Sequence, residues 1–569
     1  MAEFSAHCNA ILSSADDRAV LASTIYMRKL LSVETNPALD LVVSKGKLVA
    51  RLCDLIITGS TPAIQFEAAW AVTNISSGSS VHCEAAVGHG AHSKFLHVLA
   101  NSSNMELKEQ CVWGLGNIAG DGVGARDMCL GEGALDAILT CFPHHNAAAA
   151  HPPRSFLRNA SWAMSNLLRG SPQPPFDDSQ RDAMACLGRV FMDACGKAQG
   201  KPWACANGDH EVIVDAAWGL SYLTNGSDAR LGVICEMSSP SGACPGLVDQ
   251  LVECLSSPRP NERTPCLRTV GNIVTGNATH VKTVVQAGFL DQVVPLMKDA
   301  KRTLRKEACW ALSNVTADTN AHKQQVIAVP ECARTLLKCI GDSHDIAKEA
   351  AYVLANLFEQ ASVTVVTSGI AAGYLGVLLA CTAKNASSSN ATTQVCQEGI
   401  NAVVSMFHGS PPVQDALKAQ VQSCAAYPAL MKLAVGETRE LIEALKETLG
   451  ADFDKLFETD MSEKAAMAAL GAVLDGTAPP VAFGAGSGAQ ASAKGKTDPA
   501  GDASTSNKSA GVSAHKNNDI AAAFAPVAVA AAPLSPQEPE QPLASVELAP
   551  DNISDSGSEG SSGDDEVPP

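Results

Sequence analysis

One short helical phrase recurs seven times in this 569-residue chain, and its spacing constrains the fold more than any other feature. In each copy a bulky residue is followed by small or apolar residues and, in most copies, by a polar side chain four positions later. The copies are EAAWAVTN (67–74), EQCVWGLGN (109–117), NASWAMSN (159–166), DAAWGLSY (215–222), CLRTVGN (266–272), EACWALSN (307–314) and EAAYVLAN (349–356). Their bulky positions are Trp70, Trp113, Trp162, Trp218, Arg268, Trp310 and Tyr352, separated by 42 to 56 residues. A unit repeated at such a period buries its apolar face against its neighbours, so the pattern predicts an all-α solenoid.

The shortest of these intervals match the period of armadillo and HEAT repeats, which is ~40 to 47 residues. We therefore expect an armadillo-repeat right-handed superhelix of about ten repeats, with atypical units at its ends. A partial first repeat and two weak final copies, near 390–436 and 437–460, extend the array to residues 18–460. Three Pro- and Gly-rich segments interrupt the period and are predicted to be loops inserted between helices, not helices. These segments are 142–155, 170–182 and 196–210.

The segments outside the array differ from it in composition. Residues 1–17 are expected to be a short N-terminal lead, and residues 461–475 a helical transition segment. Residues 476–569 are rich in Ala, Gly, Ser and Pro and carry an acidic excess. Such a composition buries too little apolar surface to offset the conformational entropy of folding, so this tail is predicted to be disordered.

The net charge of −18 argues against general nucleic-acid binding and favours cationic partners such as Lys- and Arg-rich peptides. The 19 cysteines form no CxxC pair, and no secretory leader or membrane-spanning apolar stretch is visible, so a soluble protein with reduced thiols in cytoplasm or nucleus is expected. Cys141, His144, His145 and His151 cluster without a zinc-module spacing, and no catalytic or nucleotide-binding motif stands in a suitable context. We therefore expect no enzyme, no cofactor, no metal site and no membrane contact.

The chemistry of the phrase indicates a binding surface for peptides. Residues four apart share one face of a helix, so Trp70 and Asn74 point together. Stacked repeats would align such pairs in a ladder, in which indole rings accept Lys or Arg side chains and Asn amides bond to a peptide backbone. Trp in the core alone is the competing interpretation, but a repeated buried Asn without partners would be costly.

These same segments resemble the importin alpha family, the adaptors that recognise nuclear localisation signals. The resemblance covers residues 20–460 and rests on QFEAAWAVTNISSG (65–78), EQCVWGLGNIAGDG (109–122), LRNASWAMSNLLR (157–169), WGLSYLTNG (218–226), LRTVGNIVTGN (267–277) and KLLSVETNP (29–37). It implies import of cargo with Lys/Arg-rich signals, shuttling between cytoplasm and nucleus, and importin beta and an export receptor as partners. Arg268 in place of Trp is itself a family trait that lies between a major and a minor site.

The resemblance also implies the residues of each site. The major site would contain Trp70, Asn74, Gly78, Gln110, Trp113, Asn117, Asp121, Trp162 and Asn166. Asp121, in the loop after the third repeat's helix, would pair with the key lysine of the signal. The minor site would contain Arg268, Asn272, Glu307, Trp310, Asn314, Glu349, Tyr352 and Asn356, and Arg169, Glu211, Asp215, Trp218 and Tyr222 would be accessory.

Several positions depart from the family pattern. Cys83 stands in place of a Thr near the key lysine, Asn225 and Ala278 replace acids, and Tyr352 replaces the last Trp. A weakened minor site is therefore expected, with a preference for monopartite over bipartite signals. The basic N-terminal segment that binds importin beta in the family is not recognisable before the first repeat, so that partner is expected to be doubtful.

Two alternatives to an import adaptor remain open at the level of sequence. One is a general armadillo scaffold that binds another extended ligand, although a scaffold of the catenin type would need a basic surface. The other is a sequestering protein that binds the same basic cargo in the cytoplasm without carrying it through the nuclear pore.

Overall fold

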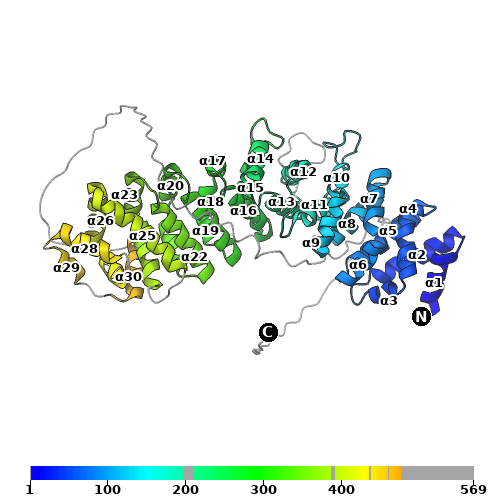
Figure 1. The fold of residues 1–569 in the computed structure, drawn as a ribbon, viewed down its shortest axis with the longest axis horizontal. Coiled ribbons are helices and arrows are strands. Elements are labelled where there is room, and N and C mark those ends of the chain that lie inside the picture. Colours follow the sequence, from blue (N-terminus) through cyan, green and yellow to red (C-terminus); the bar gives the residue numbers. More distant parts are fainter. Residues whose placement is uncertain are drawn as a thin grey trace, which may run out of the picture. The chain divides into compact units, whose positions relative to one another are not determined.

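The structure is a computed structural model that describes residues 2–196, 209–385, 391–434, 438–450, 452–458 and 461–475. All of these residues belong to one compact unit, Met1–Val529, whereas the second unit, Ala530–Pro569, lies outside the described residues. Outside them too lie the tail 476–569 and most of the expected loop 196–210. Every regular element in the described part is a helix, as expected for an all-α protein (Figure 1).

Each complete repeat consists of three helices, which we name H1, H2 and H3 in chain order. In the seventh repeat these are α17 (Ala278–Gln286), α18 (Phe289–Met297) and α19 (Arg302–Thr316). The H3 helices of the ten repeats are α2 (Asp17–Leu31), α5 (Pro62–Ser76), α8 (Met105–Asp121), α11 (Arg154–Leu168), α13 (His210–Leu223), α16 (Pro260–Ile273), α19, α22 (His344–Phe358), α25 (Ala391–Gly409) and α28 (Thr438–Leu449).

The remaining helices provide H1 and H2 of these repeats. They are α1 (Ala2–Ser13), α3 (Leu39–Val43), α4 (Gly46–Thr58), α6 (Ser80–Gly88), α7 (Ala91–Asn101), α9 (Val123–Gly131), α10 (Ala134–Leu139), α12 (Asp178–Ala194), α14 (Asp228–Ser238), α15 (Leu247–Glu253), η1 (Cys254–Ser256), α20 (Asn320–Ile327), α21 (Cys332–Ile340), α23 (Val363–Ala371), α24 (Tyr374–Lys384), α26 (Pro411–Ser423) and α27 (Ala426–Leu433). Two further helices, α29 (Asp452–Phe457) and α30 (Glu463–Leu474), follow the tenth repeat. In repeat five a single long helix, α12, takes the place of H1 and H2.

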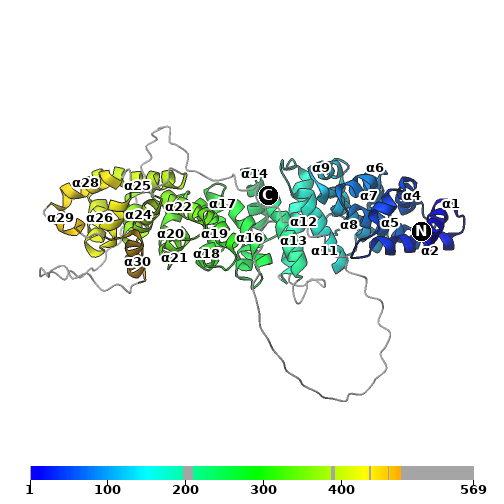
Figure 2. The ribbon, with the colours of Figure 1, turned by 90° about the horizontal axis from the view of Figure 1, so that it is seen from below.

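Each H3 helix packs against the H3 helices before and after it, and H2 helices form a second row (Figures 1 and 2). The prediction of an armadillo solenoid is therefore confirmed. Glycine makes the tight connection from H1 to H2 possible, because Gly288 and Gly373 adopt φ values of 92° and 86° that a side chain would strain. H3 helices begin at polar caps, such as Thr61 before α5 and Asn104 before α8.

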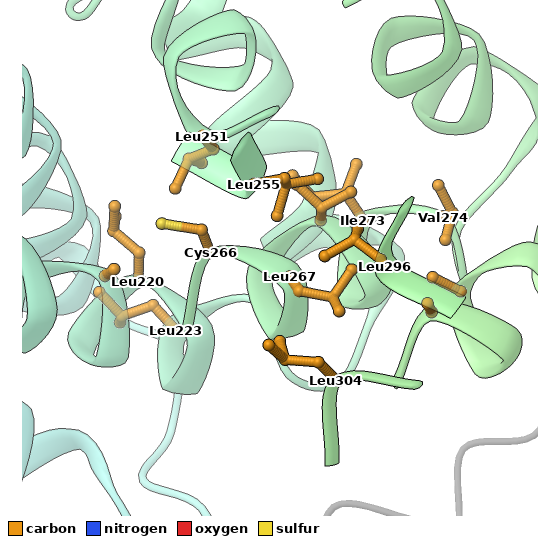
Figure 3. Packing of buried hydrophobic residues seen from close by; sticks show 14 of the residues in the cluster. Leu220, Leu223, Leu251, Leu255, Cys266, Leu267, Ile273, Val274, Leu296 and Leu304 are labelled. Atoms are coloured by element: carbon orange, nitrogen blue, oxygen red, sulfur yellow. The ribbon is translucent and has the colours of Figure 1, made fainter. Parts of the chain in front are cut away.

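One continuous apolar core runs from repeat to repeat. Figure 3 shows this at α16, where Cys266, Leu267 and Ile273 meet leucines from α13, α15, α18 and α19. Alanine is frequent on the H3 helices, and Ala216, Ala217 and Ala308 are fully buried, so adjacent H3 helices approach closely. One extended apolar core, in which small residues let neighbouring H3 helices approach, therefore holds the repeats together.

Two expectations about local structure are corrected. The segment 170–182 is not a loop throughout, because α12 begins at Asp178, where Asp177 accepts a hydrogen bond from the Gln180 amide and caps the helix. Asp121 does not lie in a loop after α8 but is the last residue of that helix.

Residues 2–13, within the expected lead, form α1, which packs on α2 and α4.

Within the described ranges no single helix is long and apolar enough to cross a membrane. Only α23 and α24 together reach that length and composition, and they are bent by 74° at their junction.

Candidate peptide-binding surface on the H3 helices

The bulky positions of the phrase differ in exposure. Trp70 on α5 and Trp310 on α19 keep only 7% and 4% of their surface exposed. The half-buried group consists of Trp113, Trp162, Trp218, Arg268 and Tyr352. The bulky and polar positions together are named the Trp/Asn row: Trp70, Asn74, Trp113, Asn117, Trp162, Asn166, Trp218, Tyr222, Arg268, Asn272, Trp310, Asn314, Tyr352 and Asn356. The half-buried rings are the ones a ligand can reach.

The asparagines of the row connect consecutive repeats. In four of them the side-chain amide donates a hydrogen bond to a backbone carbonyl of the preceding H3 helix. The accepting residue lies three positions after the bulky residue of that preceding helix. These bonds join Asn117 to Thr73 (3.1 Å), Asn166 to Gly116 (3.0 Å), Asn272 to Ser221 (2.8 Å) and Asn356 to Ser313 (3.0 Å). Asn74 donates instead to the hydroxyl of Ser32 at 2.8 Å. An Asn amide has two N–H donors and an oxygen, so one such bond leaves capacity for a peptide backbone.

Asn314 interrupts this pattern. Its amide donates to the carbonyl of Trp310 in its own helix at 3.1 Å, and its buried Oδ1 has no hydrogen-bond partner among the described residues. The connection between α16 and α19 therefore lacks the inter-repeat bond that the other asparagines make.

The residue three positions after each bulky residue is small, and at Gly116 and Gly271 the indole ring of the next repeat packs on it. A Cβ atom added at Gly116 would lie 2.4 Å from the Trp162 ring, and one at Gly271 would lie 2.3 Å from the Trp310 ring. No side chain fits between ring and backbone at these distances. The small position therefore seats the tryptophan of the next repeat.

Acidic side chains lie three residues before several bulky positions, on the same H3 face. They are Glu67, Asp215, Glu307 and Glu349, with Gln110 at the equivalent position of α8. Glu67 accepts two hydrogen bonds from Arg28, and Glu307 pairs with Arg268. Burial raises the pKa of Glu307, although the adjacent Arg268 opposes this effect.

Asp215 and Glu349 are different, because neither forms an ion pair among the described residues. Two other acids at the start of α13 and before it do form ion pairs: Asp209 with Arg154 and Arg158, and Glu211 with Arg158. Burial, with the neighbouring Glu211 and Asp209, raises the pKa of Asp215 to about 7. Burial likewise raises the pKa of Glu349 to about 7, although Lys348 and Lys306 oppose this effect, and its Oε2 atom has no hydrogen-bond partner in the part of the chain described. At each of these two carboxylates, the cationic side chain of a ligand would supply the missing ion pair.

Asp121 is exposed at the C-terminal end of α8. A carboxylate is unfavourable there, because the helix dipole places negative charge at this end. The hydroxyl of Ser80 on α6 donates to its Oδ1 at 2.8 Å, close to Gly78. Cys83 lies beneath, 1% exposed, and burial together with Asp121 raises the pKa of its thiol to about 12, so it stays a neutral thiol. The Ser80 hydroxyl thus orients the Asp121 carboxylate, which forms no ion pair among the described residues.

Three accessory residues, Arg169, Trp218 and Tyr222, have partners within the chain, whereas Gln110 of the major site leaves its side-chain oxygen unpaired in the described part. Arg169 donates to the Gly120 carbonyl at 2.8 Å and fastens the end of α8. Trp218 and Tyr222 stack with ring centroids 5.9 Å apart, in place of a Trp and Asn pair. Burial raises the pKa of Tyr222 to about 12. Gln110 is 9% exposed, and its Oε1 is buried without a partner within the described ranges.

The three best-formed pockets among the described residues are lined by side chains outside the Trp/Asn row. A cavity of 410 Å³ lies between α21 and α30, lined in part by Arg334, Leu337 and Met467. Among the described residues no three His, Cys, Asp or Glu side chains are placed to hold a metal ion. The arrangement is therefore suited to an extended ligand on a surface.

Sequence reasoning missed Arg28, Ser32, Glu67 and Ser80. The signal for two of them is the repeat period itself, because Arg28 and Ser32 lie 42 residues before Trp70 and Asn74. They are the bulky and polar positions of the first repeat.

Comparison with known proteins agrees with this architecture. The family model "Armadillo/beta-catenin-like repeat" matches residues 277–317, the seventh repeat. An engineered protein of known structure superposes with a TM-score of 0.59, covering 83% of this chain and 99% of its own, at 20% sequence identity, which supports the fold alone.

Curated relatives extend the similarity to sequence. Importin subunit alpha-1a of Oryza sativa subsp. japonica is 36% identical over 315 residues, which are 55% of this chain and 54% of the relative. Importin subunit alpha-2 of Arabidopsis thaliana is 39% identical over 241 residues, 42% and 39% of the two chains. The chain spans about half the length, or less, of these relatives. The chain thus folds as an armadillo-repeat solenoid, and the resemblance to importin alpha subunits is confirmed over about half of the chain.

Proposed function

We propose that this protein is a nuclear import adaptor that binds Lys/Arg-rich localisation signals along the Trp/Asn row. The observation that carries the proposal is that half-buried indole rings share the H3 helices with a carboxylate that forms no ion pair among the described residues, as Trp218 and Asp215 do on α13. Indole faces attract cations, and a partly buried carboxylate selects for Lys or Arg over neutral side chains. Asparagine amides supply sequence-independent bonds to the peptide backbone.

The proposal divides the row into two sites. The major site consists of Trp70, Asn74, Gly78, Gln110, Trp113, Asn117, Asp121, Trp162 and Asn166, and the minor site of Arg268, Asn272, Glu307, Trp310, Asn314, Glu349, Tyr352 and Asn356. The major site is the stronger one, because Trp113 and Trp162 are both reachable, whereas Trp310 is 4% exposed. A monopartite signal is therefore preferred over a bipartite one.

The test is the fluorescence anisotropy of a labelled Lys-rich peptide titrated with the full chain. We expect micromolar or tighter binding, weakened about 10-fold or more by Asp121→Ala, since a charge-assisted bond contributes ~1.5 to 3 kcal/mol. Asp136→Ala is the matched control, because Asp136 is an exposed acid on the H2 helix α10 and its loss changes the net charge equally. Equal losses in both variants would reduce the effect to general electrostatics, and no binding by the intact chain would refute the proposal.

Partners and localisation follow from the same proposal. The relatives are named importin subunits, which implies a carrier of the importin beta type for this chain and passage between cytoplasm and nucleus. Co-precipitation with importin beta, with and without a Lys-rich peptide, tests this directly. Peptide binding without carrier binding would favour a sequestering protein over an adaptor.

A further inference from the structure

Two arginines of this chain occupy the bulky position of their repeats, Arg28 in the first repeat and Arg268 in the sixth. Arg28 on α2 lies 39 residues before Glu67 and 42 before Trp70, and Arg268 on α16 has the same spacing to Glu307 and Trp310. Both arginines stand where other repeats carry Trp. Each contacts a glutamate and a tryptophan of the following H3 helix.

The contacts of Arg28 are the closer of the two. Its Nε atom donates to Glu67 Oε2 at 2.8 Å, its second guanidinium nitrogen donates to Oε1 at 3.3 Å, and its Cζ lies 4.3 Å from the Trp70 ring centroid. The side chains of Arg28 and Glu67 are 17% and 14% exposed. Arg268 pairs with Glu307, and its Cζ lies 5.7 Å from the Trp310 ring.

A guanidinium held by a carboxylate and an indole face makes the contacts that a basic ligand side chain would make. The slot formed by Glu67 and Trp70 is therefore already filled by the chain itself. Where the preceding repeat carries Trp at this position, as Trp162 does before Asp215, the acid has no ion pair in the described part of the chain. The identity of one residue in the preceding repeat thus decides whether a slot is filled or open.

We infer that Arg28 is an internal ligand that closes the slot of Glu67 and Trp70, so that this end of the row is unavailable to basic side chains of a bound peptide. Arg28 is in this sense a specificity-determining residue, since it limits how many Lys or Arg residues the surface reads. The inference rests on the proposed function. Arg28, together with the edge-on ring of Phe66 at 5.8 Å, contributes to the low exposure of Trp70 (7%), whereas Trp113 and Trp162 are half-buried.

The experiment compares two peptides, a short Lys-rich core and the same core extended by two lysines at each end. We expect Arg28→Ala to bind the extended peptide about 3- to 10-fold more tightly than the wild type, since a cation over an indole ring contributes ~0.5 to 2 kcal/mol. Affinity for the short core should stay unchanged. Adding Glu67→Gln to Arg28→Ala should abolish the gain, because the acid of the slot is then gone.

Arg18→Ala is the matched control, since Arg18 is exposed on the same helix and its loss removes the same charge. Arg28→Gln is a second variant that is less prone to misfold, because the glutamine amide can still donate a hydrogen bond to Glu67. We expect its gain in affinity for the extended peptide to be smaller than that of Arg28→Ala. An equal gain in Arg18→Ala, or no gain in a folded Arg28 variant, would overturn the inference. Failure of the wild type to bind even the short core would refute the proposed function instead.

Discussion

At the scale of single residues, Asp215 shows how binding can oppose stability. Burial raises its pKa to about 7 in the folded chain, whereas an unfolded Asp titrates near ~3.9. Between these values the folded state binds more protons than the unfolded state, so this residue's contribution to stability falls as pH rises from about 4 to 7. The carboxylate is thus retained at a cost to folding, as expected of a residue kept for a ligand.

The replacement Asp215→Asn separates the two effects. At pH 8 we expect the variant to have a higher melting temperature than the wild type and a weaker affinity for a Lys-rich peptide. In the wild type a bound lysine favours the ionised form, so affinity should increase between pH 6 and pH 8, and the variant should show less of this increase. Thermal unfolding and anisotropy at the two pH values measure both quantities, and a variant that is less stable at pH 8 would contradict this account.

At the scale of the element, the H3 helices could be predicted well from the sequence, but their contacts could not. The four-residue spacing of Trp113 and Asn117 fixes a shared face in any helix, so the row could be predicted without a structure. The donation of the Asn117 amide to Thr73 in the preceding repeat depends on how two helices are offset, which no local pattern encodes. Arg28 escaped notice because its copy of the phrase lacks both Trp and Asn.

The bonds between H3 helices allow a comparison of two asparagines. In Asn166→Ala the Gly116 carbonyl loses its buried donor across the repeat junction, which should cost about 1 to 3 kcal/mol in the free energy of unfolding. Asn314→Ala should cost less, because that amide bonds within its own helix and its Oδ1 is already unsatisfied. Urea denaturation of both variants measures the difference, and equal losses would show that the inter-repeat bond adds nothing.

At the scale of the whole molecule, the sequence predicts the repeats and a helical segment at 461–475, but not where that helix, α30, packs. Helix α30 packs across three H2 helices, α21, α24 and α27. Arg334 on α21 pairs with Asp475 and donates to the Gly471 carbonyl at its C-terminal end. A Cβ at Gly376 would lie 2.8 Å from Leu470, so the glycine allows the close approach. The sequence 461–475 does not repeat an earlier unit. The repeat period therefore gives no information about where this single helix packs.

This arrangement predicts that α30 stabilises the last repeats alone. Leu470 is fully buried, so Leu470→Ala should cost about 2 to 5 kcal/mol locally. In a solenoid each repeat contacts only its neighbours, and the loss should therefore appear as faster amide hydrogen exchange in α21, α24 and α27, with little change in α5 and α8. Affinity for a short Lys-rich peptide should also be unaffected, since the major site lies on the distant repeats two to four. Glu463→Ala, at the start of α30, serves as the control. Faster exchange in α5 and α8 as well would mean that the repeats unfold as one cooperative unit, and the two ends of the row could then no longer act independently.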